Sequence, residues 1–244
     1  MHFIGKLLVR LLKLPPKKKA VFVTTFTFNN AMFIGLPINT IVFGHDGLPY
    51  LFTFYLVTIV LFWSLGAYTL CNASDLSVQK DNKVFSWKKI LSPGLIGVFI
   101  GCFLAGFALH LPRILETSLA YLGDICVPLS LLVIGSNLAR SLSKGFQRIT
   151  FDQILIMMGK FLIHPAIMFG AFTLSGPAFL GLTSFTAADL PFQVFVLCAA
   201  LPCHAQTAIL AEFYDLEGEY ASNLVSLSTL ICLFTIPVYA GMLL

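Results

Sequence analysis

Polar side chains interrupt the apolar stretches of this sequence at a few positions, and these residues are the ones able to do chemistry. Asn30 lies seven residues before Pro37 in one stretch, and His204 and Gln206 follow Pro202 in another. An unpaired amide in hydrocarbon is costly, so such groups should face protein, water or a ligand. We take all five residues as candidate ligand-binding positions.

Each of these positions also has a purely structural interpretation. Asn30 would then only cap a broken helix, and Gln206, one helical turn after Pro202, would only make an interhelical packing contact. His204 either titrates near neutral pH or is a buried, hydrogen-bonded neutral histidine.

Three ionisable side chains inside apolar stretches are candidates for ion coupling. Asp124 lies four residues before Pro128, and a partly desolvated carboxylate there would take up a proton. Lys160 and His164 are four residues apart and share a helix face. Lys160 would attract an anion or balance Asp124, whereas the alternatives are a snorkelling lysine and an interfacial aspartate.

Motifs for metal, nucleotide or covalent chemistry are missing from the sequence. The six cysteines form no CxxC pair and are interpreted as apolar packing residues, so no metal site or cofactor is predicted. There is no GxxxxGK[ST] phosphate loop, no HExxH zinc motif and no GxSxG elbow. We therefore do not expect an enzyme or an ATP-driven pump.

The composition sets the surroundings in which these residues work. Of 244 residues, 58% are hydrophobic and only 11% are charged, with a formal net charge of +4; soluble domains carry about a quarter charged residues. A soluble globule, a disordered chain and a nucleic-acid-binding module are excluded. The chain is expected to be an all-α membrane protein, because lipid offers backbone groups no hydrogen-bond partner.

Apolar stretches bounded by charge, Gly or Pro predict about seven transmembrane helices. The predicted spans are 20–43, 48–71, 92–111, 115–139, 151–174, 190–213 and 220–244.

The basic residues orient these spans. If the spans alternate in direction, thirteen of the 15 lysine and arginine residues fall on one side of the membrane. The positive-inside rule then predicts a multi-pass protein of the cytoplasmic membrane, with its N-terminus in the cytoplasm and its C-terminus outside.

The first and sixth predicted spans share an unusual feature, because each carries an interior proline beside polar or small residues. Interior proline removes a backbone hydrogen bond, and a plain kink is the simpler interpretation. The two spans match, however: Val21–Val23 and Val194–Val196 both read Val-Phe-Val, and the spans enter the membrane from opposite sides. This pattern predicts an inverted repeat with two broken helices.

The predicted repeat is incomplete at its N-terminal end. We expect 1–19 to be a cytoplasmic basic segment left from a preceding helix, and 20–71 to end the first repeat. A cytoplasmic loop at 72–91 would lead to a complete second repeat of five helices at 92–244. Three further spans ahead of residue 20 would complete the pair.

Four motifs in order resemble the auxin efflux carrier family of membrane transporters. Asn30 with Phe33–Pro37 is similar to its Asn-x-x-Phe-hydrophobic-Gly-x-Pro signature, and Pro128–Leu138 resembles its Pro-Leu-x-Leu…Gly-x-x-Leu segment. Leu201-Pro202 followed by Ala211–Tyr214, and then Ser228–Leu230 with Pro237, resemble its second crossover and final span.

The resemblance implies a 5+5 inverted-repeat fold related to bile-acid/sodium symporters, here lacking most of the first three helices. It implies secondary transport of small organic anions, such as auxin-like or dicarboxylate acids, by alternating access at two crossed broken helices. Expected partners are the anion, a proton or sodium ion, the lipid bilayer and a second copy in a homodimer. The family often has a small residue where His204 stands.

Two other classes of protein have some of these features. A non-transporting, truncated fragment of such a carrier is the alternative that the missing helices predict. A seven-span retinal protein is disfavoured, because its lysine is expected in the last span and Lys160 lies in the fifth.

Overall fold

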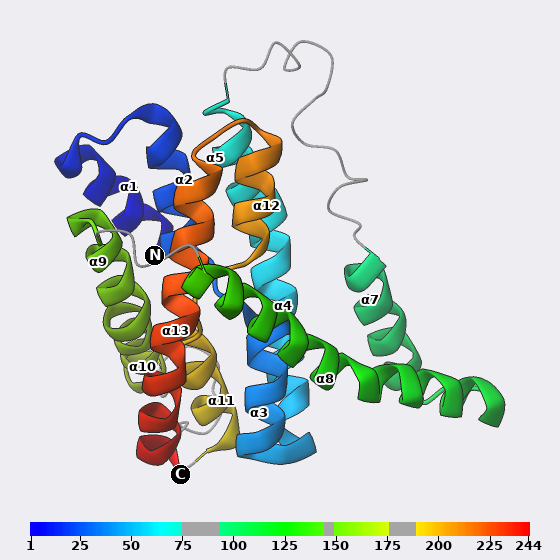
Figure 1. Cartoon of the computed structure of the whole chain (residues 1–244). Helices are drawn as coiled ribbons and strands as arrows, with labels where there is room; N and C mark the ends of the chain where they lie inside the picture. Colours follow the sequence, from blue (N-terminus) through cyan, green and yellow to red (C-terminus); the bar gives the residue numbers. More distant parts are fainter. Residues whose placement is uncertain (75–92, 144–148, 176–188) are drawn as a thin grey trace.

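The computed structural model describes residues 1–74, 93–143, 149–175 and 189–244, and these are almost entirely helical (Figure 1). Within them, the extended backbone pairs only at an isolated antiparallel bridge between Asn29 and Cys203. The loop predicted at 72–91 falls almost wholly outside the described residues. The division into repeats at 20–71 and 92–244 stays a prediction.

The N-terminal half is a succession of helices joined by short turns. Proline stands in the first turn of α2, where its missing N–H costs nothing, and near the starts of α3 and α4, which continue η1 and η2. The chain reverses at Gly44, whose φ of 66° suits glycine. The elements are α1 (His2–Leu12), α2 (Pro16–Thr27), the π-helical η1 (Ala31–Gly35), α3 (Leu36–Phe43), η2 (Gly44–Gly47), α4 (Leu48–Leu61), η3 (Phe62–Gly66) and α5 (Ala67–Cys71).

The C-terminal half is also a succession of helices. In Figure 1, α8 crosses the front of the bundle and extends away from it together with α7, while α13 runs the length of the bundle. The elements are α7 (Pro93–Gly106), α8 (Arg113–Ser143), α9 (Phe151–Met158), η5 (Gly159–Ile163), α10 (His164–Ser175), α11 (Leu190–Ala199), α12 (Gln206–Phe213) and α13 (Gly218–Leu243).

Three helical stretches among the described residues are long and apolar enough to cross a membrane. They are Ala31–Cys71, Phe151–Thr173 and Gly218–Leu243. The last two agree with the predicted spans 151–174 and 220–244, and the first contains the predicted span 48–71. The predicted span 92–111 is shortened to the 14 residues of α7. The count of seven spans stays a prediction.

The first helix break lies earlier than the position of Pro37 suggested. Helix α2 ends at Thr27, residues 28–30 are extended or irregular, and helical structure resumes at Ala31. Pro37 lies near the start of α3, which continues η1 without interruption, so the helix does not break at this proline. The second break, at 200–205, does include Pro202.

One end of the bundle is held together by polar contacts. Asp152 at the start of α9 accepts a hydrogen bond from the Tyr220 hydroxyl and pairs with Lys18 of α2 at 3.1 Å. Lys17 reaches Asp215, beyond α12, at 3.4 Å. The basic start of α2 thus lies beside the starts of α9 and α13 and the end of α12.

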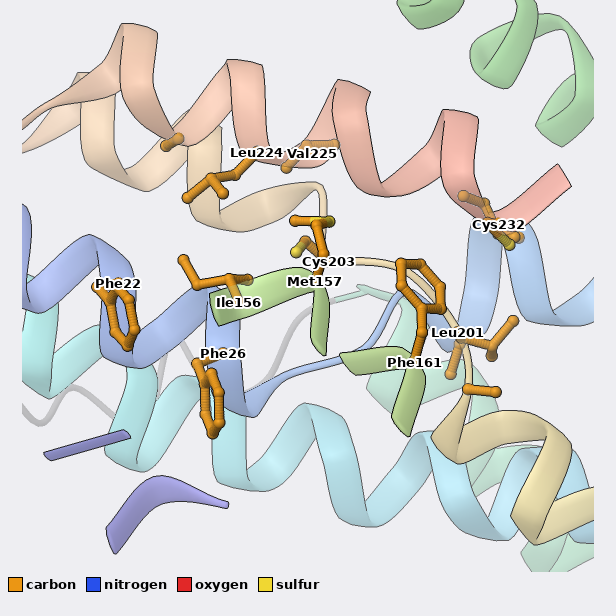
Figure 2. Packing of buried hydrophobic residues seen from close by; sticks show 14 of the residues in the cluster. Phe22, Phe26, Ile156, Met157, Phe161, Leu201, Cys203, Leu224, Val225 and Cys232 are labelled. Atoms are coloured by element: carbon orange, nitrogen blue, oxygen red, sulfur yellow. The ribbon is translucent and has the colours of Figure 1, made fainter. Parts of the chain in front are cut away.

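The core lies where α2, α9 and η5 meet the segment between α11 and α12. Figure 2 shows Met157 and Phe161 turned toward the extended segment that carries Leu201 and Cys203. Gly159 belongs to this core: a Cβ added there would overlap the ring of Phe26, which is itself fully buried. Helix α2 and η5 are close at this point because residue 159 has no side chain.

Gly159→Ala should therefore destabilise the fold by about 1–3 kcal/mol through overpacking. We expect a thermal midpoint lower by several degrees for the purified protein in detergent. Gly170→Ala in α10 is the matched control, since a Cβ there meets nothing within 4 Å; its midpoint should be unchanged or higher. Equal midpoints for the two variants would contradict this packing.

Candidate functional site

The two helix breaks cross each other at the centre of the structure. The Asn30 N–H donates to the Pro202 carbonyl at 2.9 Å, and the His204 N–H donates to the Phe28 carbonyl at 3.2 Å. Extended backbone cannot satisfy its own polar groups, and lipid cannot satisfy them either. Each break therefore supplies hydrogen-bond partners to the other, although they are about 170 residues apart in the sequence.

Asn29 is the residue that joins the crossing to its surroundings. It is 1% exposed, and its amide nitrogen donates to the carbonyls of Cys198 and Ala199, both at 2.9 Å. These carbonyls belong to the last turn of α11, where intrahelical partners run out. Asn29 thus replaces the hydrogen bonds that α11 loses by ending inside the protein.

Lys160 lies fully buried beneath the same crossing, with 0% of its surface exposed. Its ammonium donates hydrogen bonds to the Phe28 carbonyl and to the Asn29 side-chain oxygen. The side chain therefore does not snorkel. Nor does it balance Asp124, because the described residues place no carboxylate within ion-pair distance of Lys160. Asp124 is exposed on α8.

The helices that resume after the crossing are capped by the predicted ligand residues. The Asn30 side-chain oxygen accepts from the Phe33 N–H at 3.3 Å at the start of η1. His204 Nδ1 accepts from the Gln206 N–H at 3.3 Å at the start of α12. Asn30 is 4% exposed, and its amide NH₂ has no acceptor among the described residues. Asn30 therefore caps a helix and still keeps donors for a ligand.

The His204 side chain packs against an aromatic ring inside the protein. Its ring stacks on Phe62, with centroids 4.4 Å apart and planes 8° apart. Cys203, labelled in Figure 2, lies in the same segment. Its N–H donates to the Ser228 hydroxyl at 3.0 Å. The segment is thus held on both sides, by α13 through Ser228 and by η3 through Phe62.

Two buried polar atoms at the start of α12 have no partner among the described residues. They are the Gln206 side-chain oxygen and the Thr207 hydroxyl. Buried polar atoms are normally satisfied, so such atoms mark a place for water or a ligand. Gln206 begins α12 and Pro202 lies in extended backbone. The one-turn helical spacing predicted between them does not exist.

Two cavities lie in this part of the molecule, and the larger of them reaches the crossing. One, of about 210 Å³, is apolar and lies between α3 and α13, where it includes Pro37 and Thr229. The other, of about 330 Å³, reaches Asn29 and His164. His164 Nδ1 is buried and has no partner among the described residues. Asn29 thus bonds to Lys160 and lines a cavity together with His164.

Sequence reasoning missed Asn29, Ser228 and Phe62 as parts of the site. Asn29 had a signal, since it adjoins Asn30 at the point where the helix breaks. Ser228 and Phe62 had none, because their roles depend on contacts with residues far away in the chain. Among the residues that the structure describes, no three His, Cys, Asp or Glu side chains gather as a metal site would require.

Two broken helices crossing inside a helical membrane protein, with polar groups gathered at the crossing, define a membrane transport protein. The profile of the family described as "Membrane transport protein" matches residues 1–240. The chain belongs to this family, the auxin efflux carrier family that the motifs resemble.

Curated relatives agree with this assignment. An "Uncharacterized transporter" of Methanocaldococcus jannaschii is 25% identical over 247 residues, covering 100% of this chain and 73% of the relative. One of Methanothermobacter thermautotrophicus is 26% identical over 88% of this chain and 65% of the relative. A "Putative malonate transporter" of Rhizobium meliloti is 26% identical over 59% of this chain and 41% of the relative.

Asn29→Ala tests the central contact. It takes the amide donor away from the Cys198 and Ala199 carbonyls, although Cys198 keeps the Leu201 N–H at 3.4 Å, and it leaves Lys160 with one acceptor. Each unsatisfied buried group costs about 1–3 kcal/mol. We expect a loss of thermal stability larger than that of Asn30→Ala, which removes only a 3.3 Å cap bond. Asn72→Ala, at an exposed position after α5, is the control. If Asn29→Ala melts like the control, Asn29 does not have this role.

Proposed function

We propose that the chain is a secondary transporter that moves small organic anions across the cytoplasmic membrane by alternating access, with the helix crossing as its binding site. Its membership of a membrane transport family supports the general function. The choice of an anion rests on the charge at the crossing.

The observation that carries the proposal is the buried ammonium of Lys160 without a carboxylate among the described residues. Two half-helices, α2 and α11, end at the crossing, and two, η1–α3 and α12, begin there. Each helix end carries about half an elementary charge, so the four ends nearly cancel. Lys160 then leaves the crossing with a net charge of about +1, which favours a bound anion.

The donors at the crossing suit a carboxylate. Asn30 has an unused amide NH₂, and the N-terminal ends of η1 and α12 face the break, as in other anion sites built from half-helices. The cavity that reaches Asn29, of about 330 Å³, has the size of a small acid rather than a peptide. The name of the Rhizobium meliloti relative makes a dicarboxylate such as malonate the first substrate to try.

The orientation in the membrane, the oligomeric state and the energy source of the proposed transporter rest on the sequence rather than on the fold. The cytoplasmic N-terminus, the outside C-terminus and assembly as a homodimer remain part of the proposal. A proton gradient, a sodium gradient or the membrane potential would drive the cycle, with Asp124 and His164 as further coupling candidates.

The direct test is uptake of radiolabelled malonate, and of indole-3-acetate as a monocarboxylate, by liposomes containing the purified 244-residue chain. We expect uptake above that of empty liposomes, with competition by unlabelled substrate. No flux of either acid, in either direction and under any imposed gradient, would contradict the proposal.

Asn30→Ala and Gln206→Ala should abolish this uptake without loss of expression, because both remove polar groups at the proposed site while leaving Asn29 and Lys160 in place. Asn72→Ala should transport at the rate of the unmodified chain. Flux at that same rate in both site variants would show that the anion binds elsewhere.

A further inference from the structure

The Lys160 ammonium occupies a position with the ligands of a metal cation. Its two acceptors are the Phe28 carbonyl, freed because α2 ends at Thr27, and the Asn29 amide oxygen. Carbonyl and amide oxygens are the ligands that hard cations prefer. In transporters with broken helices, the backbone carbonyls of the unwound segments and the C-terminal ends of the half-helices coordinate Na⁺ or H⁺.

The surrounding charges also require a cation at this point. The C-terminal ends of α2 and α11 both meet here, and each carries about −0.5 elementary charge. Asn29 donates to the α11 carbonyls and turns its own oxygen toward Lys160. The negative ends of two half-helices are therefore connected through one amide to one ammonium.

Lys160 reaches this position from a local widening of its own helix. It lies in η5, a π-helical turn between α9 and α10, and Gly159 before it lets η5 approach the Phe26 ring. Single π-turns of this kind often occur at functional sites. The ammonium is fully buried, so the site is closed to bulk solvent.

We propose that Lys160 is a tethered substitute for a coupling cation. The ammonium permanently fills the cation position at the crossing, so this chain neither binds nor needs Na⁺ there. Removing the side chain should open a site that a small monovalent cation fills. The transport part of this inference rests on the proposed function, whereas the cation-binding part does not.

The test is a cation titration of thermal stability, which needs no substrate. The purified 244-residue chain, Lys160→Ala and Lys160→Gln are melted in NaCl, LiCl and choline chloride at equal ionic strength. In Lys160→Ala we expect a saturable rise of about 3–6 °C with Na⁺ or Li⁺ over choline, the shift given by a ligand at about ten times its Kd in a domain of this size.

The unmodified chain and Lys160→Gln should show no such difference, because the ammonium or the amide still fills the position. Lys6→Ala, at an exposed position in α1, controls for the loss of a lysine elsewhere. If Lys160→Ala is not recovered folded in choline, recovery in Na⁺ alone supports the proposal, and failure in both salts contradicts it. Equal midpoints in Na⁺ and choline for folded Lys160→Ala also overturn it, as does a Na⁺ shift in the unmodified chain.

A flux measurement separates this inference from the proposed function. Anion uptake by the unmodified chain should be the same, within twofold, with an inward Na⁺ gradient or with choline. Uptake that depends on the Na⁺ gradient, together with a Na⁺ shift in the thermal titration of the unmodified chain, contradicts the tethered cation and leaves the anion carrier intact. Absence of all uptake contradicts the carrier, while the thermal titration still decides the role of Lys160.

Discussion

The structure depends on satisfying the backbone groups of two helices that stop in the middle of the protein. A helix that ends within a membrane protein leaves carbonyls and N–H groups that neither lipid nor a regular helix can pair. Here the two interruptions pair with each other, through Asn30 to Pro202 and His204 to Phe28. The remaining groups are bonded by Asn29, Lys160 and Ser228.

This arrangement requires close approach of backbones, which explains the small residues around it. A Cβ at Gly35 would come within 2.8 Å of Leu201, and one at Gly66 within 2.9 Å of the Phe28 ring. Each glycine therefore lies against one side chain of a crossing segment. Together with the stacking of Phe62 on His204, these contacts fix the position of both segments relative to η1 and η3.

A rigid crossing with one buried ammonium has a functional consequence. The half-helix ends supply partial charges of both signs, and Lys160 shifts the sum toward positive. The negative ends and the ammonium are already bonded to each other, whereas the Asn30 amide and the Gln206 oxygen still have capacity. The same group of residues thus holds the fold together and also offers polar atoms that have no partner among the described residues.

The sequence by itself determined the membrane environment and the approximate places where helices break. Apolar stretches with few charges exclude a soluble fold, and the Asn29-Asn30 and Pro202 segments cannot continue a helix cheaply. It also singled out Lys160, because an ammonium inside an apolar stretch needs a partner.

Only the tertiary structure decided which partner each group has. The sequence offered an anion, Asp124 or the membrane interface as surroundings for the Lys160 ammonium, yet Lys160 bonds Phe28 and Asn29, and Asp124 lies exposed on α8. It favoured Asn30 over Asn29, yet Asn29 makes the long-range contacts. The last carbonyls of a helix accept hydrogen bonds either from a nearby residue or from a segment far away in the chain. The composition and the residue spacing of the sequence are the same in both cases. Folding selects between them by bringing the distant segment within hydrogen-bond distance.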